Sequence, residues 1–245
     1  MKSIGFRLRI AHRNALFSRT TVALLLVLAV LACLFSGCGT SVKVGSSSAS
    51  SPASTAPVAL STAPAQGTPG DPYYKNTDPL PGVRVTEMSK FYEFGGSTPD
   101  EMRRKINDVR PKEYDAWTNW DLSYDYNPVK GSMGYTTSNP SVTLKVTYTF
   151  PKWKRPQGAT QQTADSWNKY MADLSRHELG HRMIAVDYAN KILQDLQPGN
   201  VFPSEKSLHD AEDEMFAALL EQCNEAEAAY DDATNHGAAQ GAQFP

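Results

Sequence analysis

Residues 162–196 read QTADSWNKYMADLSRHELGHRMIAVDYANKILQDL, and this stretch decides the fold. Its apolar and histidine side chains recur every three or four positions, which is the spacing of one helix face. The pattern predicts a single long helix over residues 162–196 that ends before the turn residues Pro198, Gly199 and Asn200. The predicted face consists of Trp167, Tyr170, Leu174, His177, His181, Ile184, Tyr188 and Ile192.

A second helix is predicted after Ser204, whose hydroxyl suits the capping position. This helix should end near Ala233, before Gly237. Because only a short turn separates the two helices, we expect them to form an antiparallel hairpin. The face residues of the second helix are Leu208, Met215, Leu219, Ala226 and Tyr230.

The sequence before the hairpin predicts strands at residues 83–94, 116–126 and 142–150. The third of these alternates apolar and polar side chains, which is typical of a half-buried strand. Ser97, Thr98 and Pro99 should begin a short helix that ends near Val109. We therefore expect one α+β domain over residues 83–245. It should contain a small antiparallel sheet of three or four strands with a short helix, packed on a long C-terminal helical hairpin.

The motif His177-Glu178-Leu179-Gly180-His181 indicates metal chemistry. Two histidines four positions apart lie on the same side of a helix, one turn from each other. Their imidazoles could bind one Zn²⁺ ion, and Glu178 could take a proton from a zinc-bound water. The alternative is that both histidines and the glutamate have structural roles only. Gly180 inside a helix favours a close approach to the backbone, either by a functional group or by the neighbouring helix.

A catalytic zinc site needs a third protein ligand, and several residues are possible. Asp187 is excluded, because an unbroken helix turns it about 120° away from His181. His209 should lie about 15 Å away along the helix axis. Glu221 and Glu225 should face the motif across the hairpin, so both are alternatives for the third ligand.

Residues 230–245 read YDDATNHGAAQGAQFP. This run resembles the pattern Y-D-x-x-T-x-H-G-x-x-Q-G-A-x-F-P, which ends a bacterial domain-of-unknown-function family described as predicted secreted zinc-dependent proteases. That family also carries H-E-x-x-H with a Trp and a Tyr shortly before it, here Trp167 and Tyr170. The resemblance covers roughly residues 83–245.

The resemblance implies roles for three residues of this C-terminal run. It makes His236 the preferred third zinc ligand, since the neighbouring Gly237 would let the chain turn back towards the helix. Asp231 would orient a ligating histidine from outside the ligand set. Tyr230 would stabilise the oxyanion as a catalytic residue, or else it is a core residue.

The N-terminus predicts export. Residues 1–37 combine five basic side chains with an apolar run over residues 21–35, which is typical of a signal peptide. An uncleaved anchor is the alternative reading of this segment. Residues 34–38, LFSGC, resemble the bacterial lipobox, although Phe35 stands where Leu is usual. The resemblance implies cleavage before Cys38, acylation of its sulfur and attachment to a bacterial membrane, with the domain outside the cytoplasm.

Residues 38–82 are rich in Ser, Ala, Thr and Pro, which predicts a flexible tether between the acylated cysteine and the domain. Loss of the five leader residues from the 24 basic ones leaves 19 against 26 acidic residues. This acidic balance gives no reason to expect a nucleic-acid partner.

These features together predict a membrane-anchored zinc-dependent peptidase that acts on protein or peptide outside the cytoplasm. One alternative is a non-catalytic lipoprotein in which the histidines form a structural metal site. Another is a binding module that uses the aromatic-rich sheet.

Overall fold

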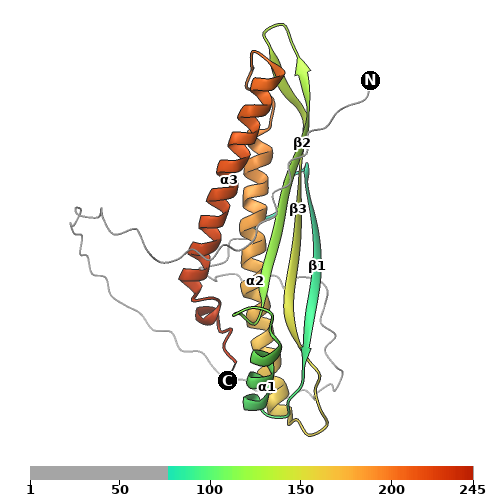
Figure 1. Ribbon diagram of the computed structural model, residues 1–245, viewed down its shortest axis with the longest axis vertical. Coiled ribbons are helices and arrows are strands. Elements are labelled where there is room, and N and C mark those ends of the chain that lie inside the picture. The colour runs from blue at the N-terminus through green and yellow to red at the C-terminus, as the bar shows by residue number, and fades with distance from the viewer. Residues whose placement is uncertain (1–76, 245) are drawn as a thin grey trace, which may run out of the picture. The chain divides into compact units, whose positions relative to one another are not determined.

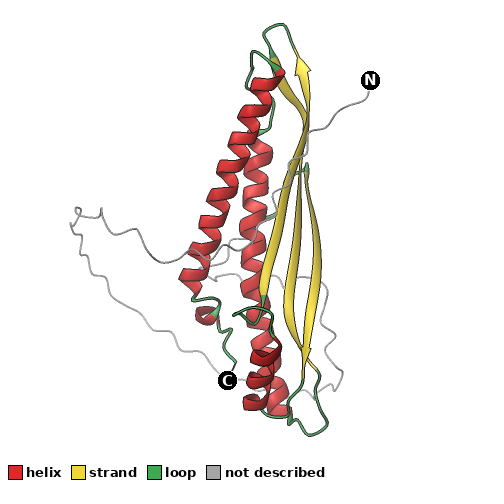
Figure 2. Ribbon diagram, viewed as in Figure 1, coloured by secondary structure: helices red, strands yellow, loops and turns green. Residues whose placement is uncertain are grey.

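A computed structural model describes residues 77–244 of the protein. The predicted signal peptide, Cys38 and nearly all of the predicted tether lie outside these residues. The helical hairpin covers one face of the sheet, so the described part has two layers (Figures 1 and 2). In chain order the elements are β1 (Val83–Phe94), α1 (Pro99–Val109), β2 (Trp117–Lys130), β3 (Tyr135–Trp153), α2 (Gln161–Asp195), α3 (Glu205–Thr234) and the 3₁₀ turn η1 (Ala238–Gln240).

The expected α+β class is confirmed, but the sheet is mixed rather than wholly antiparallel. The strand order is β1-β3-β2. β2 and β3 form an antiparallel pair, whereas β1 runs parallel to β3 with Val83 opposite Val142. Alternating apolar residues identify a strand and its buried face, but they do not specify its neighbour or direction. α1 connects one edge of the sheet to the other, and this connection makes β1 and β3 parallel.

The β2–β3 hairpin is longer than the sequence predicted. β3 contains 19 residues and begins at Tyr135 rather than near residue 142. The turn between the strands includes Gly134, which has a φ of 144°. Tyr135 also forms a β-bridge with Phe202 in the loop between α2 and α3. The sequence did not predict this extension, because it contains Pro, Asn and Ser residues, which are unusual inside strands.

The two long helices begin and end close to the predicted residues. The Thr160 side chain accepts a hydrogen bond from the Thr163 backbone amide at the start of α2. Ser204 caps α3, as predicted, through a reciprocal arrangement with Ser207. α3 ends at Asn235 in the left-handed conformation, one turn after Asp231.

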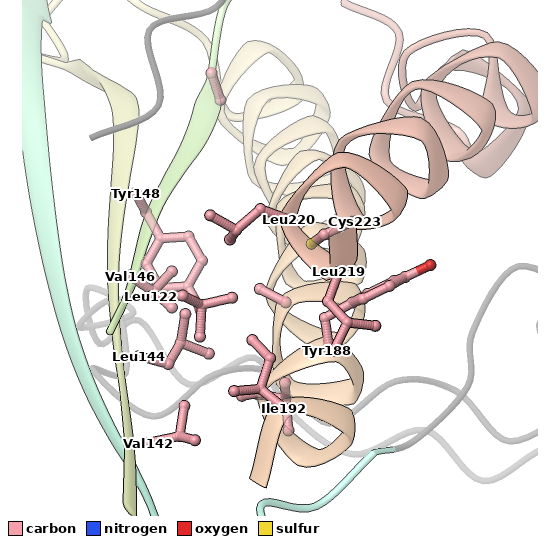
Figure 3. Close-up of a cluster of buried hydrophobic side chains, with 14 of the residues drawn as sticks. Leu122, Val142, Leu144, Val146, Tyr148, Tyr188, Ile192, Leu219, Leu220 and Cys223 are labelled. Atoms are coloured by element: carbon pink, nitrogen blue, oxygen red, sulfur yellow. The ribbon is translucent and has the colours of Figure 1, made fainter. Parts of the chain in front are cut away.

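The main core lies between the sheet and the hairpin. Alternate residues of β3 face the helices, and Val142, Leu144 and Val146 are each at most 1% exposed. Figure 3 shows these side chains meeting residues of α2 and α3, among them Cys223, which is fully buried. The other labelled members of this cluster are Leu122, Tyr148, Tyr188, Ile192, Leu219 and Leu220. This packing holds α2 between the sheet and α3.

Contacts with the domain begin before the first strand. The side chain of Asn190 donates to the carbonyl of Asp78 and accepts from the amide of Leu80, both at 2.9 Å. The segment just before β1 is therefore attached to α2 near its C-terminal end. Within residues 77–244, none of the helices is both long and apolar enough to cross a membrane.

Glu212 on α3 predicts a pH-dependent stability. Its side chain is 5% exposed, and burial, with a contribution from the charge of Asp195, raises its pKa from 4.5 to about 7. The folded state therefore binds this proton more tightly than the unfolded state does. Ionisation of Glu212 therefore lowers the free energy of unfolding. This destabilisation is absent below about pH 4.5, grows as the pH rises towards 7 and is constant at higher pH.

We expect Glu212→Gln to raise the Tm by a few degrees at pH 8 and to change it little at pH 4.5. About 1 kcal/mol shifts the Tm of a domain of this size by about 2–4 °C. The exposed Glu214 lies on the same helix, and Glu214→Gln provides the control. Equal Tm changes for Glu212→Gln at the two pH values, measured by thermal unfolding, would contradict this explanation.

Candidate metal centre

The two histidines of the H-E-x-x-H motif converge at the buried side of α2. His177 and His181 are 4% and 7% exposed. Their Nε2 atoms lie 3.3 Å apart, and their ring planes are nearly perpendicular. Both Nε2 atoms therefore point towards one location between α2 and α3.

Asp231, on the last turn of α3, provides the third donor atom at this location. Its Oδ1 lies 3.2 Å from Nε2 of His177 and 3.1 Å from Nε2 of His181. Among residues 77–244, His177, His181 and Asp231 form a group of potential ligand atoms close enough to share one ion. The Asp231 side chain is 31% exposed, so it forms the side of the group that is open to solvent.

The spacing of these three atoms fits zinc. Zinc ligands lie about 2.0–2.1 Å from the ion, so two ligand atoms of a tetrahedron are about 3.3–3.4 Å apart. The three observed separations are 3.1, 3.2 and 3.3 Å. Two imidazoles and one carboxylate are also a ligand set that zinc accepts in catalytic sites. His177, His181 and Asp231 could therefore form one face of a tetrahedral zinc site.

Each imidazole is oriented through its other nitrogen. Nδ1 of His181 contacts the carboxylate of Glu227, and Nδ1 of His177 lies 3.1 Å from Oε1 of Gln240. Because both partners are acceptor oxygens, each Nδ1 carries the proton and donates it. Each Nε2 can then bind a metal ion once it gives up any proton that it shares with Asp231, as in the carboxylate–histidine arrangements of zinc proteins.

Glu178 lies beside this group and is itself almost fully buried, with 2% exposure. The Thr118 hydroxyl on β2 donates to Oε2 of Glu178 at 2.7 Å. Burial raises the pKa of Glu178, although the nearby histidines and Thr118 oppose this effect. A carboxylate with a raised pKa and a fixed orientation is suited to accept a proton near neutral pH.

The electrostatics of the site favour a positive charge between the helices. Burial opposes ionisation of Asp231, but hydrogen bonds with His177 and His181 hold its pKa below the ordinary value. Burial would lower the pKa of His181, but Glu227 and Asp231 outweigh it, so the pKa of His181 is raised. The carboxylates of α3 therefore stabilise a cation at the imidazoles.

Tyr230, which the sequence analysis expected to stabilise an oxyanion, reaches the site. Its hydroxyl contacts groups of the protein itself. The hydroxyl lies 3.2 Å from both the carbonyl of His177 and Oε1 of Gln240. Its ring stacks on that of His177 at 5.1 Å between centroids. A Cβ at Gly180 would overlap the Tyr230 ring, which explains the glycine in the middle of α2. These contacts favour a role in supporting His177 and its neighbours.

The structure brings His236 near the site but outside the three-residue group. Its Nδ1 lies 3.6 Å from Oδ1 of Asp231, and its half-exposed ring packs 4.7 Å from that of Tyr114. The sequence analysis preferred His236 as the third ligand and placed Asp231 outside the ligand set, whereas in the structure Asp231 lies within the three-residue group and His236 lies beside it. The reason is that α3 continues to Thr234, which keeps Asp231 on the helix face towards α2.

The two alternative third ligands lie away from the site. Glu221 and Glu225 are both exposed on α3, and neither belongs to the group around His177. Asp187, which the sequence analysis excluded, pairs with Lys191 at 3.0 Å. The excluded His209 contacts the Tyr126 hydroxyl at 2.6 Å.

Glu227, Gln240 and Thr118 were not identified from the sequence. Glu227 and Asp231 are four residues apart and continue the face of α3 that carries Phe216 and Cys223. Carboxylates on an otherwise buried face were therefore a signal that could have been recognised. Thr118 had no comparable signal, because only the packing of β2 against α2 brings it to Glu178.

The C-terminal segment passes directly behind His177. Gly237 has a φ of 83°, and a Cβ there would lie 2.9 Å from Cγ of His177. Arg176 donates to the carbonyl of Gln240 at 3.1 Å, and Arg103 donates to that of Phe244 at the same distance. The glycine and glutamine of the C-terminal motif are therefore needed to place an acceptor at His177.

A comparison with protein families gives a match over most of the described residues. The model of a family described as "Bacterial protein of unknown function (DUF922)" matches residues 89–237. This range includes β1 from its middle onwards, the whole hairpin and His177, His181 and Asp231. No curated protein and no solved structure matches the chain.

The geometry makes opposite predictions for Asp231 and His236. Asp231→Asn should weaken zinc binding by more than about 100-fold, because loss of groups outside the ligand set already costs about 10–100-fold. His236→Ala should bind zinc within about threefold of wild type. Competition with a chromophoric chelator measures both constants. If zinc affinity fell in His236→Ala and persisted in Asp231→Asn, the ligand assignment would be reversed.

Proposed function

Since this chain belongs to the bacterial DUF922 family, whose function is unknown, we propose its function from the metal centre itself: zinc-dependent hydrolysis of peptide bonds. The observation that carries the proposal is the triangle of His177, His181 and Asp231 with the buried Glu178 beside it. Its substrates would be proteins or peptides, as expected from the resemblance to zinc-dependent proteases.

Three protein ligands support a catalytic site over a structural one. Structural zinc sites usually have four protein ligands, whereas catalytic sites leave one position for water or substrate. His177, His181 and Asp231 would leave the fourth position of a tetrahedral site to water or substrate, and Asp231 is the partly exposed member of the group. Bound zinc would polarise a substrate carbonyl and lower the pKa of a water molecule.

Glu178 would move the proton in this reaction. Burial raises the pKa of its carboxyl group, which makes the carboxylate a better base than an exposed glutamate. The hydrogen bond from Thr118 holds the carboxylate in one orientation. Glu178 would accept the proton of the attacking water and then pass it to the nitrogen of the leaving peptide segment.

The role proposed for Tyr230 is to support the histidines. A phenol could stabilise an oxyanion, but this hydroxyl lies within hydrogen-bonding distance of His177 and Gln240. We therefore assign it no proton transfer. Gly180 accommodates its ring, so the Gly180–Tyr230 pair sets the distance between α2 and α3 at the site.

A structural metal site is the second candidate. The three potential ligands come from both long helices, so an ion would join α2 to α3. Such a site would stabilise the hairpin without needing Glu178. The two candidates therefore differ in whether the Glu178 carboxylate is needed for the function of the site.

Glu178→Gln should retain zinc and lose activity. Wild type and the variant should each bind about one zinc ion, while only wild type should cleave a peptide library or denatured casein. Because the general base contributes about 10²–10⁴-fold to such reactions, the loss should be at least about 100-fold. Chelation should abolish cleavage by wild type and readdition of zinc should restore it. Equal cleavage by the two proteins would remove Glu178 from the mechanism.

We also propose that acylated Cys38 anchors the enzyme to a bacterial membrane, with the domain outside the cytoplasm. The basic leader, the apolar run and the sequence LFSGC before the linker support this location. In the native host, Cys38→Ser should shift the protein from the membrane fraction to a soluble or uncleaved form. Membrane retention of a processed Cys38→Ser protein would contradict lipid attachment.

A further inference from the structure

Glu227 is a buried carboxylate that the proposed reaction does not use. Its side chain is 15% exposed and contacts Nδ1 of His181 through Oε2. Its other oxygen, Oε1, is buried and has no hydrogen-bond partner within the described residues. An unsatisfied buried oxygen destabilises a fold, so its presence here requires a reason.

We infer that Glu227 is a positioning residue that sets the metal affinity of the site through His181. The inference rests on the proposed zinc site, and it extends that site to a residue outside the ligand set. By accepting the proton of Nδ1, Glu227 directs Nε2 of His181 towards Asp231 and His177. The ring is then oriented for the metal before the metal binds.

The two imidazoles have different acceptors, and this difference favours Glu227 as the stronger determinant. His181 donates to a carboxylate, whereas His177 donates to the neutral amide oxygen of Gln240. Hydrogen bonds to an ionised acceptor are roughly twice as strong as those between neutral groups. Gln240 also lies 3.2 Å from the Tyr230 hydroxyl, which competes for the same oxygen.

Charge balance gives Glu227 a second role. Histidines bind zinc in the neutral form, so Asp231 alone would offset one of the two positive charges of the ion. Glu227 provides a second negative charge, one helical turn before Asp231 on α3. Burying an unbalanced charge is costly, so removal of this carboxylate should disfavour the zinc-bound state more than the metal-free state. With the ion's charge offset by Asp231 and Glu227, the carboxylate of Glu178 remains available for proton transfer.

The test compares Glu227→Gln with Glu225→Gln, which neutralises an exposed glutamate on the same helix. Two quantities are measured for each protein: the zinc dissociation constant, by chelator competition, and the Tm of the metal-free form. Glu227→Gln should weaken zinc binding by about 10–100-fold. Its metal-free Tm should stay close to that of wild type, because the amide oxygen of glutamine can still accept the proton of Nδ1. Glu225→Gln should change neither quantity.

A purely structural role for Glu227 would produce the reverse result, with a lower metal-free Tm and an unchanged zinc dissociation constant. Zinc affinity of Glu227→Gln within about threefold of wild type would overturn the inference. Glu227→Asp keeps the charge but shortens the side chain, so its affinity should lie between those of wild type and Glu227→Gln. This second variant decides the matter if Glu227→Gln does not fold.

The same measurements separate this inference from the proposed function. If wild type binds zinc, cleaves nothing and loses affinity on Glu227→Gln, the peptidase proposal fails and the inference stands. If wild type cleaves and Glu227→Gln binds zinc normally, the inference alone fails. If wild type does not bind zinc, both fail.

Discussion

The contact between the imidazoles of α2 and the carboxylates of α3 is the interaction on which the candidate site depends. His177 and His181 are buried, and their Nε2 atoms meet the carboxylate of Asp231. Polar groups at such a depth are stable only when they are paired. The hairpin therefore needs these contacts for its own stability, and the contacts in turn produce a set of donor atoms spaced for a metal ion.

The rest of the domain holds the two helices at the distance that this contact requires. The sheet packs against α2 through alternate residues of β3 (Figure 3), and Thr118 of β2 contacts Glu178. Gly180 lets the ring of Tyr230 approach the backbone of α2, which a larger residue would prevent. The C-terminal segment then places Gln240 behind His177. Each of these elements orients one side chain of the site.

Local patterns in the sequence identify the helices, their capping residues and the spacing of the two histidines, because all three depend on neighbours within a few positions. The face of α3 also contains Glu227 and Asp231 in register with buried apolar residues. Their importance could have been inferred from that position. The roles of Asp231 and His236 could not be separated in this way, because they depend on where α3 ends relative to α2.

By itself, the sequence determined that a long helix presents two imidazoles on one side and that a second helix follows it in an antiparallel hairpin. The tertiary structure decided which carboxylates meet those imidazoles, that β1 runs parallel to β3, and that Thr118 contacts Glu178. The physical reason is the range of the interactions. Helix periodicity is fixed by hydrogen bonds four residues apart, whereas these contacts join residues 46–60 positions apart, whose meeting depends on the packing of the whole domain.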